Sequence, residues 1–153
     1  MEQNTNPTPQ QPQGNQGFDF NKVPKESWIL AGISFLGFIS VFLPWGVWNA
    51  YFFKVSISGV SGYGGFGVQW AGILTMLVYL AFITIILFGE AIKIDQKTKE
   101  TIMKFGAIAP FVLGVIAFLV IMGKEGSLGF GLIFNLLSAI AIFLIGNKVI
   151  KLK

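Results

Sequence analysis

The stretch from Glu90 to Lys104, EAIKIDQKTKETIMK, is the only dense run of charged residues in the chain. Long apolar runs lie on both sides of it. Two lie upstream and are separated by a segment rich in Gly and Phe, and two lie downstream and are separated by a few polar residues. A water-soluble domain needs a largely polar surface and has no use for this much hydrocarbon around one charged segment. The pattern therefore predicts a membrane protein in which the charged stretch is a loop between two pairs of spans.

The composition of the chain supports this prediction. Hydrophobic residues make up 54% of the 153 residues and charged residues only 12%, with a mean hydropathy of +0.70. A typical soluble domain has about 25% charged residues. The first 27 residues are different, because they are polar and rich in Gln, Asn and Pro. Such a segment cannot bury enough apolar surface to become ordered, so residues 1–27 are predicted to be a disordered cytoplasmic tail.

The four apolar runs predict the transmembrane domain, which occupies residues 28–153. A span needs roughly 20 apolar residues. The predicted spans cover about residues 28–48, 68–88, 105–122 and 128–146. The short GKEGS connection makes the last two an antiparallel hairpin. We therefore expect an all-α membrane protein whose four transmembrane helices form two antiparallel hairpins. Tryptophans near the ends of the spans are the predicted interfacial anchors: Trp28, Trp45, Trp48 and Trp70.

The first loop between spans has a different pattern. From Phe53 to Ser58, apolar and polar residues alternate, with Phe53, Val55 and Ile57 on one side. Period-two alternation rich in β-branched residues predicts a short, half-buried strand. Five glycines follow between Gly59 and Gly67. We expect a short β element at this membrane face.

Small and polar residues recur at three- and four-residue spacing within the last three spans. Residues at this spacing share one face of a helix, and small residues there let helices approach closely. An amide in hydrocarbon needs a partner, so Asn135 is expected to form an interhelical hydrogen bond or, alternatively, a ligand contact. The residues assigned to helix packing or to a possible cavity are Gly72, Thr75, Tyr79, Gly106, Pro110, Gly114, Gly131, Asn135 and Ser138.

The lysines predict the orientation of the chain. If the tail, the charged loop and the C-terminus share one side, that side holds nine of the eleven lysines. The other side holds only Lys54 and Lys124. The positive-inside rule then places both termini in the cytoplasm and the Gly-rich loop outside.

One part of the chain resembles a known group. Phe42-Leu43-Pro44-Trp45 is followed by the short strand and then by Ser58-Gly59 and Ser61-Gly62 before the second span. This order resembles a recurrent pattern in small uncharacterised bacterial four-helix membrane proteins, over roughly residues 29–88. The resemblance implies a location in the bacterial inner membrane. It implies no particular activity.

The residue types that are missing narrow the function. The chain has no Cys, His or Arg, and no ionisable residue except Tyr79 lies within a predicted span. Thiol chemistry, histidine acid–base catalysis and bidentate phosphate recognition are therefore excluded. We expect no enzyme, no metal and no cofactor. The lysines lie beside apolar runs and form no patch, so nucleic acid is not an expected partner.

Three hypotheses remain. The leading one is a non-enzymatic membrane protein that acts through helix and loop contacts, as an accessory subunit, a scaffold or a homo-oligomer. Its expected partners are the lipid bilayer and either a membrane protein or further copies of the chain. The second is a transporter or channel for a neutral or apolar solute, with a path lined by Thr75, Tyr79, Asn135 and Ser138. The third is a holin-like or immunity-type membrane protein.

Overall fold

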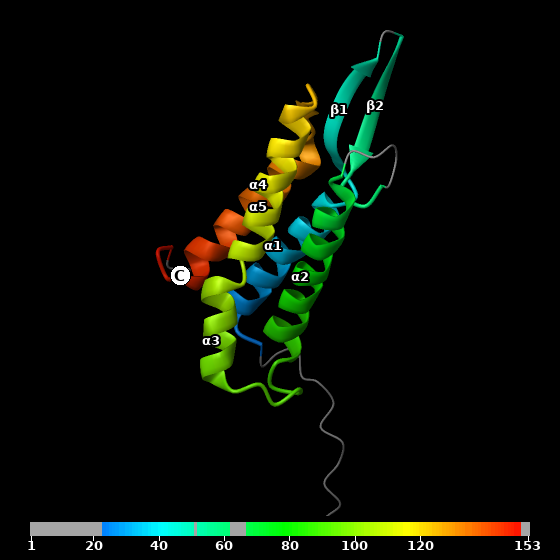
Figure 1. Ribbon diagram of the computed structural model, residues 1–153. Coiled ribbons are helices and arrows are strands. Elements are labelled where there is room, and N and C mark those ends of the chain that lie inside the picture. The colour runs from blue at the N-terminus through cyan, green and yellow to red at the C-terminus, as the bar shows by residue number, and fades with distance from the viewer. Residues whose placement is uncertain (1–22, 51, 62–66, 151–153) are drawn as a thin grey trace, which may run out of the picture.

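The structure of the protein is a computed structural model that describes residues 23–50, 52–61 and 67–150. It is mostly helical, with a small sheet at one end (Figure 1). In chain order its elements are α1 (Lys25–Ser40), β1 (Pro44–Ala50), β2 (Phe53–Ser58), α2 (Gln69–Phe88), α3 (Gln96–Phe105), α4 (Ile108–Gly123), β3 (Ser127–Leu128) and α5 (Phe130–Gly146).

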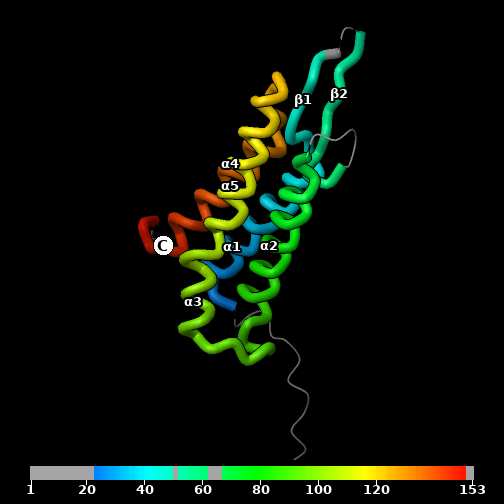
Figure 2. The backbone as a smooth tube through the Cα atoms, viewed as in Figure 1, coloured from blue at the N-terminus to red at the C-terminus, as the bar shows by residue number. Residues whose placement is uncertain are grey.

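The four longer helices pack in a ring. α1 packs mainly against α2 and α5, and α4 packs mainly against the same two helices. The core has two hydrophobic clusters. One lies near the sheet and includes Trp45, Ile57 and Ile121, and the other includes Tyr79 and Phe82. The short helix α3 lies at the opposite end of the helices from the sheet (Figure 2).

The sheet has three antiparallel strands in the order β2-β1-β3. Its first two strands form a hairpin that extends past the ends of the helices (Figure 1). The third strand belongs to the connection between α4 and α5, so the sheet joins two connections that are distant in sequence. Strand β2 matches the strand predicted from alternation, and its Ile57 side chain is buried.

The first helix is shorter than the sequence predicted. We expected a span to Trp48, but α1 ends at Ser40 and β1 begins at Pro44. Proline has no N–H to donate within a helix, and the residues that follow pair with β2 instead. The fourth apolar run also begins later, at Phe130, because Ser127 and Leu128 pair with β1.

The charged loop is largely a helix, which corrects the sequence prediction. Asp95 caps α3, because its Oδ2 accepts a hydrogen bond of 2.9 Å from the Thr98 N–H. Hydrogen bonding from the Thr98 side chain, and then from this N–H, lowers the pKa of the exposed Asp95 carboxyl. The chain passes from α3 into α4 with little interruption, since the Gly106 N–H still donates to the Ile102 carbonyl at 2.8 Å.

Two helical segments are long and apolar enough to cross a membrane within the described residues. They are Gln69–Phe88 and Gln96–Gly123, of which the second takes α3 and α4 together; Phe130–Gly146 is apolar but shorter. Only 33% and 28% of the apolar windows of the two longer segments are buried. A core helix of a soluble protein would be mostly buried, so these helices keep most of their apolar surface on the outside.

Some predictions lie outside the described residues. They are the disorder of residues 1–22, the glycines within residues 62–66, and the lysines within residues 151–153. Residues 25–27 of the predicted tail form the first turn of α1.

Candidate functional site

The most polar contact inside the protein is centred on Asn135 of α5. The Tyr79 hydroxyl of α2 lies 3.0 Å from Asn135 Oδ1 and 3.1 Å from the Asn135 carbonyl oxygen, and it donates its proton to this pair of acceptors. Asn135 Nδ2 donates to the Pro110 carbonyl of α4 at 3.3 Å. Tyr79 and Asn135 are completely buried. We call Tyr79, Pro110 and Asn135 the Asn135 cluster; it links three helices.

Two glycines make room for the Asn135 cluster. A Cβ atom at Gly114 of α4 would lie 2.7 Å from Asn135 Nδ2, which is too close for a real contact. A Cβ atom at Gly37 of α1 would overlap the Tyr79 ring. The lack of side chains at these positions therefore allows α1 and α4 to approach the cluster. All four long helices contribute to this one site.

Gly37 is not among the packing residues predicted from the sequence. The first apolar run places Ser34, Gly37 and Ser40 three residues apart, and the structure buries all of them. This spacing of small and polar residues predicts a packing face, as the same spacing did in the other three apolar runs.

The remaining predicted packing residues do not join the cluster. Thr75 and Ser138 are buried, and within the described residues Thr75 Oγ1 has no hydrogen-bond partner. Gly72 packs against the backbone of Gly59, after strand β2, so it contacts the base of the sheet. Gly72, Thr75 and Ser138 are thus placed in the core.

Gly131 and Gly106 lie where other parts of the protein pack closely against the helices. A Cβ atom at Gly131 would meet the carbonyl groups of Ser40 and Leu43, where α5 passes the end of α1. A Cβ atom at Gly106 would meet the Phe82 ring and the Ile102 carbonyl. Gly72 and Gly131 thus let neighbouring backbones approach closely near the sheet, and Gly106 makes room for the Phe82 ring near α3.

The four tryptophans differ in their surroundings. Trp28 and Trp70 are exposed, as interfacial anchors must be. Trp45 is completely buried under the sheet and donates from Nε1 to the Ser40 carbonyl at 3.0 Å, so its assignment as an anchor is wrong. Trp48 donates to the Lys124 carbonyl at 2.9 Å and covers Gly126. This contact ties the hairpin to the turn after α4.

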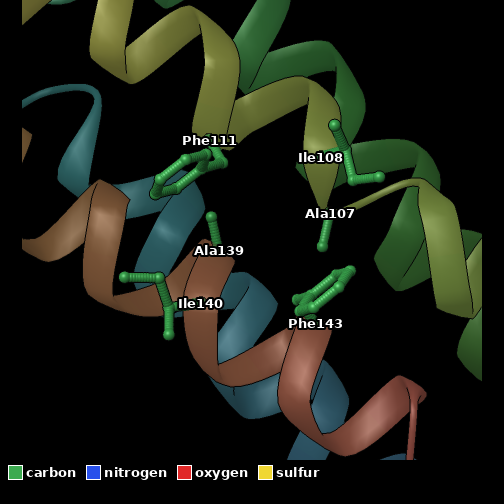
Figure 3. A pocket seen from close by; sticks show the side chains of 6 residues that line it. All are labelled: Ala107, Ile108, Phe111, Ala139, Ile140 and Phe143. Atoms are coloured by element: carbon green, nitrogen blue, oxygen red, sulfur yellow. The ribbon is translucent and has the colours of Figure 1, made fainter.

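None of Thr75, Tyr79, Asn135 and Ser138 lines either of two surface hollows formed by the described residues. The first is an apolar groove of about 300 Å³ between α4 and α5 (Figure 3). The second, of about 220 Å³, lies where α1, α3 and α5 meet; we call it the polar hollow because five charged residues line it, beside apolar ones such as Leu30 and Ile145. Among the described residues, no group of three or more His, Cys, Asp or Glu side chains is arranged to hold a metal ion.

A comparison of the chain with protein-family models, with curated proteins and with solved structures finds no match. The resemblance noted in the sequence stays a prediction, and the function must be argued from the geometry of this chain.

Proposed function

We propose that this chain is an integral inner-membrane protein of four spans that has no enzymatic activity and acts through contacts, as an accessory or scaffold subunit. The observation that carries the proposal is the distribution of side chains between the inside and the outside. Each long helix turns large apolar side chains outward, and its small and polar residues lie inside together with the apolar core.

The contrast is clear on every long helix. Leu36, Leu77, Leu119 and Leu137 come from α1, α2, α4 and α5, and each is half exposed or more. On the same helices, the residues Ser34, Thr75, Gly114 and Asn135 are buried. In water this arrangement would leave a large apolar surface exposed. In a bilayer it is favourable, because lipid covers the apolar surface and polar groups need partners inside the protein.

At the end of α1, a backbone carbonyl group is hydrogen-bonded within the protein, as a segment inside a membrane requires. α1 has 16 residues, which span about 24 Å at 1.5 Å each and so fall short of a hydrocarbon core of about 30 Å. The chain beyond α1 must then bury its polar backbone groups in protein. The Ser40 carbonyl accepts from Trp45 Nε1 at 3.0 Å and from the Leu43 N–H at 3.3 Å. The chain after α1 can therefore complete the crossing of the hydrocarbon core, because Trp45 of β1 bonds to the end of the helix.

The orientation follows from the lysines. The turn before α3, α3 itself and the turn after α5 carry Lys93, Lys97, Lys99, Lys104 and Lys148. The sheet end carries Lys54 and Lys124. The positive-inside rule supports a cytoplasmic α3 end, with both chain termini on that side and the sheet outside.

The contacts inside the protein favour a scaffold over a transporter. The Tyr79 and Asn135 side chains, which the transport hypothesis assigned to a solute path, bond to each other and to Pro110. A solute would have to replace these bonds. The small faces of α4 and α5 also meet within one chain, at Gly114 and Asn135. Contacts with a partner are therefore assigned to the outward apolar faces and to the sheet.

Labelling of single cysteines tests the membrane proposal. The chain has no native cysteine, so one cysteine can be introduced at a time. Ser56 of β2 and Lys97 of α3 are exposed at opposite ends, and Leu80 is exposed on the middle of α2. In intact cells, an impermeant maleimide should label Ser56→Cys only. After cell lysis it should also label Lys97→Cys.

Leu80→Cys should be labelled only after denaturation in detergent, because lipid covers it. Rapid labelling of Leu80→Cys in intact membranes would contradict the proposed spans, and labelling of Lys97→Cys in intact cells would contradict the orientation. Purification in mild detergent, followed by mass spectrometry, then tests the scaffold role. A stoichiometric membrane-protein partner is expected, and solute flux by the pure protein in liposomes would overturn it.

A further inference from the structure

The apolar groove between α4 and α5 has the form of a site for a hydrocarbon chain. Its floor contains Ala107 and Ala139, and Phe111 and Phe143 stand on either side (Figure 3). Its lining residues are all apolar, and its volume of about 300 Å³ is twice that of an engineered cavity of about 150 Å³ that binds benzene. The groove therefore has room for part of an extended chain.

The second hollow supplies polar groups near the same end of α4 and α5. Three lysines, Lys99, Lys104 and Lys148, line it together with Glu26 and Glu100. Lysine ammonium groups bind phosphate, and carboxylates accept hydrogen bonds from hydroxyl groups. The balance of three cations to two anions favours a ligand that is negatively charged overall.

The two hollows share no lining residue, and the close contact of α3 with α5 at Met103 and Gly146 lies between them. Lys104 lines the polar hollow and precedes the groove residue Ala107 by less than one helical turn. Asn147 follows the groove residue Phe143 by about one turn, and its Nδ2 donates to the Lys104 carbonyl at 3.4 Å. At this end of the groove, the hydrogen bond therefore joins α3 to the end of α5, beside Lys104 and Lys148.

We propose that the groove and the polar hollow together bind one anionic phospholipid whose headgroup carries hydroxyl groups. An acyl chain lies in the groove, the phosphate contacts Lys104 and Lys148, and the carboxylates accept from the headgroup hydroxyls. The inference rests on the proposed membrane function, since it places the polar hollow at the cytoplasmic headgroup layer. Basic pockets between helices at that layer are suited to anionic headgroups.

Native mass spectrometry of the purified full chain tests the proposal. Dioleoylphosphatidylglycerol is titrated against dioleoylphosphatidylethanolamine and dioleoylphosphatidylcholine, which have the same acyl chains. Each lysine near an anionic group is expected to contribute about fivefold in affinity. The double variant Lys104→Gln/Lys148→Gln should therefore bind phosphatidylglycerol about 25-fold more weakly. The matched control Lys97→Gln alters an exposed lysine of α3 outside the hollow and should bind as the wild type does.

A second pair of variants tests the groove. Ile140→Trp fills it from its exposed rim, whereas Leu137→Trp adds the same bulk to an exposed position of α5 outside it. Excluding two methylene groups of the acyl chain from the groove should lower the affinity for the lipid about 15-fold. Ile140→Trp should weaken the binding of all three lipids by about this factor, and Leu137→Trp should not.

Three results would overturn the proposal. Equal binding of the three lipids, or tighter binding of either zwitterionic one, would remove the anionic selectivity. Equal binding of soluble glycerol phosphate and phosphatidylglycerol would assign the hollow to a free phosphate ester. Loss of a dimer in Ile140→Trp, with lipid binding unchanged, would assign the groove to a second copy. Cysteine labelling reports separately on membrane insertion, so failure of lipid selectivity alone leaves the proposed function standing.

Discussion

Replacing Tyr79 by Phe should weaken the packing of α2 against α5, because it removes only the hydroxyl of the Asn135 cluster. The hydroxyl has one proton and two acceptors, at 3.0 and 3.1 Å, so one hydrogen bond is lost. Interhelical hydrogen bonds in membranes average about 0.6 kcal/mol and reach about 1.7 kcal/mol. Both partners are completely buried here. We therefore expect a loss of about 1 to 1.7 kcal/mol in the free energy of unfolding.

Asn135→Ala should cost more, because it also removes the bond to Pro110 and leaves a space. The loss should be about 2 kcal/mol or more. The Asn135 backbone carbonyl remains in this variant and still accepts from Tyr79. In a double-mutant cycle, the coupling energy between the two side chains should thus be smaller than the cost of Tyr79→Phe alone.

The assay is unfolding in mixed micelles by titration with dodecyl sulfate, followed by circular dichroism of the helices. Thr84→Val is the matched control, because among the described residues its hydroxyl bonds to the Leu80 carbonyl of the same helix, at 2.9 Å. It should change the free energy of unfolding by less than Tyr79→Phe does. Equal effects of the two variants would refute the structural role of the cluster. Unchanged stability of Tyr79→Phe with altered solute flux would instead support the transport hypothesis.

Two further predictions concern the ends of the helices. Gly72→Ala should destabilise the protein by about 1 to 3 kcal/mol in the same titration, because the new methyl group would overlap the Gly59 carbonyl. Gly32→Ala, with no atom within 4 Å of the new methyl group, should be neutral or stabilising by up to about 1 kcal/mol, and similar losses in both variants would contradict this reasoning. The pKa of Asp95 is lowered by hydrogen bonding from the Thr98 side chain and from the Thr98 N–H, so the cap of α3 is present above the ordinary carboxyl pKa of about 4 and is lost as the pH falls through the lowered value. Amide exchange at Thr98, corrected for its intrinsic pH dependence, should therefore accelerate in acid in the wild type and not in Asp95→Asn, which keeps a cap that does not titrate; the same acid response in both proteins would exclude this mechanism.

The sequence predicted those parts of the structure that depend on local patterns. The alternation from Phe53 to Ser58 gave strand β2, and the long apolar runs gave α2, α4 and α5 nearly in their observed positions. Asn135 was expected to bond across helices, and it does. An amide among apolar residues has few other ways to satisfy its hydrogen bonds, which is why this prediction needed no tertiary information.

The parts that were missed depend on partners distant in sequence. Residues 44–48 are apolar and aromatic, so they were assigned to the first span; they form a strand because β2 and β3 pair with that segment on both sides. Trp45 was assigned to the membrane surface because tryptophan is common there, but it lies under the sheet those strands build. Helix α3 had a local signal in Asp95 and Thr98, which was hidden by the reading of dense charge as a loop.

The sheet and the Asn135 cluster hold the same two hairpins together at different depths. Strands β1 and β2 belong to the connection between α1 and α2, and β3 belongs to the connection between α4 and α5. The Trp48 bond to Lys124 and the Gly129 N–H bond to the Trp45 carbonyl reinforce this link. Lipid provides no hydrophobic force to hold helical hairpins together, so such links must come from the chain itself. Under the proposed scaffold function, a partner that binds the sheet would therefore contact both hairpins at once.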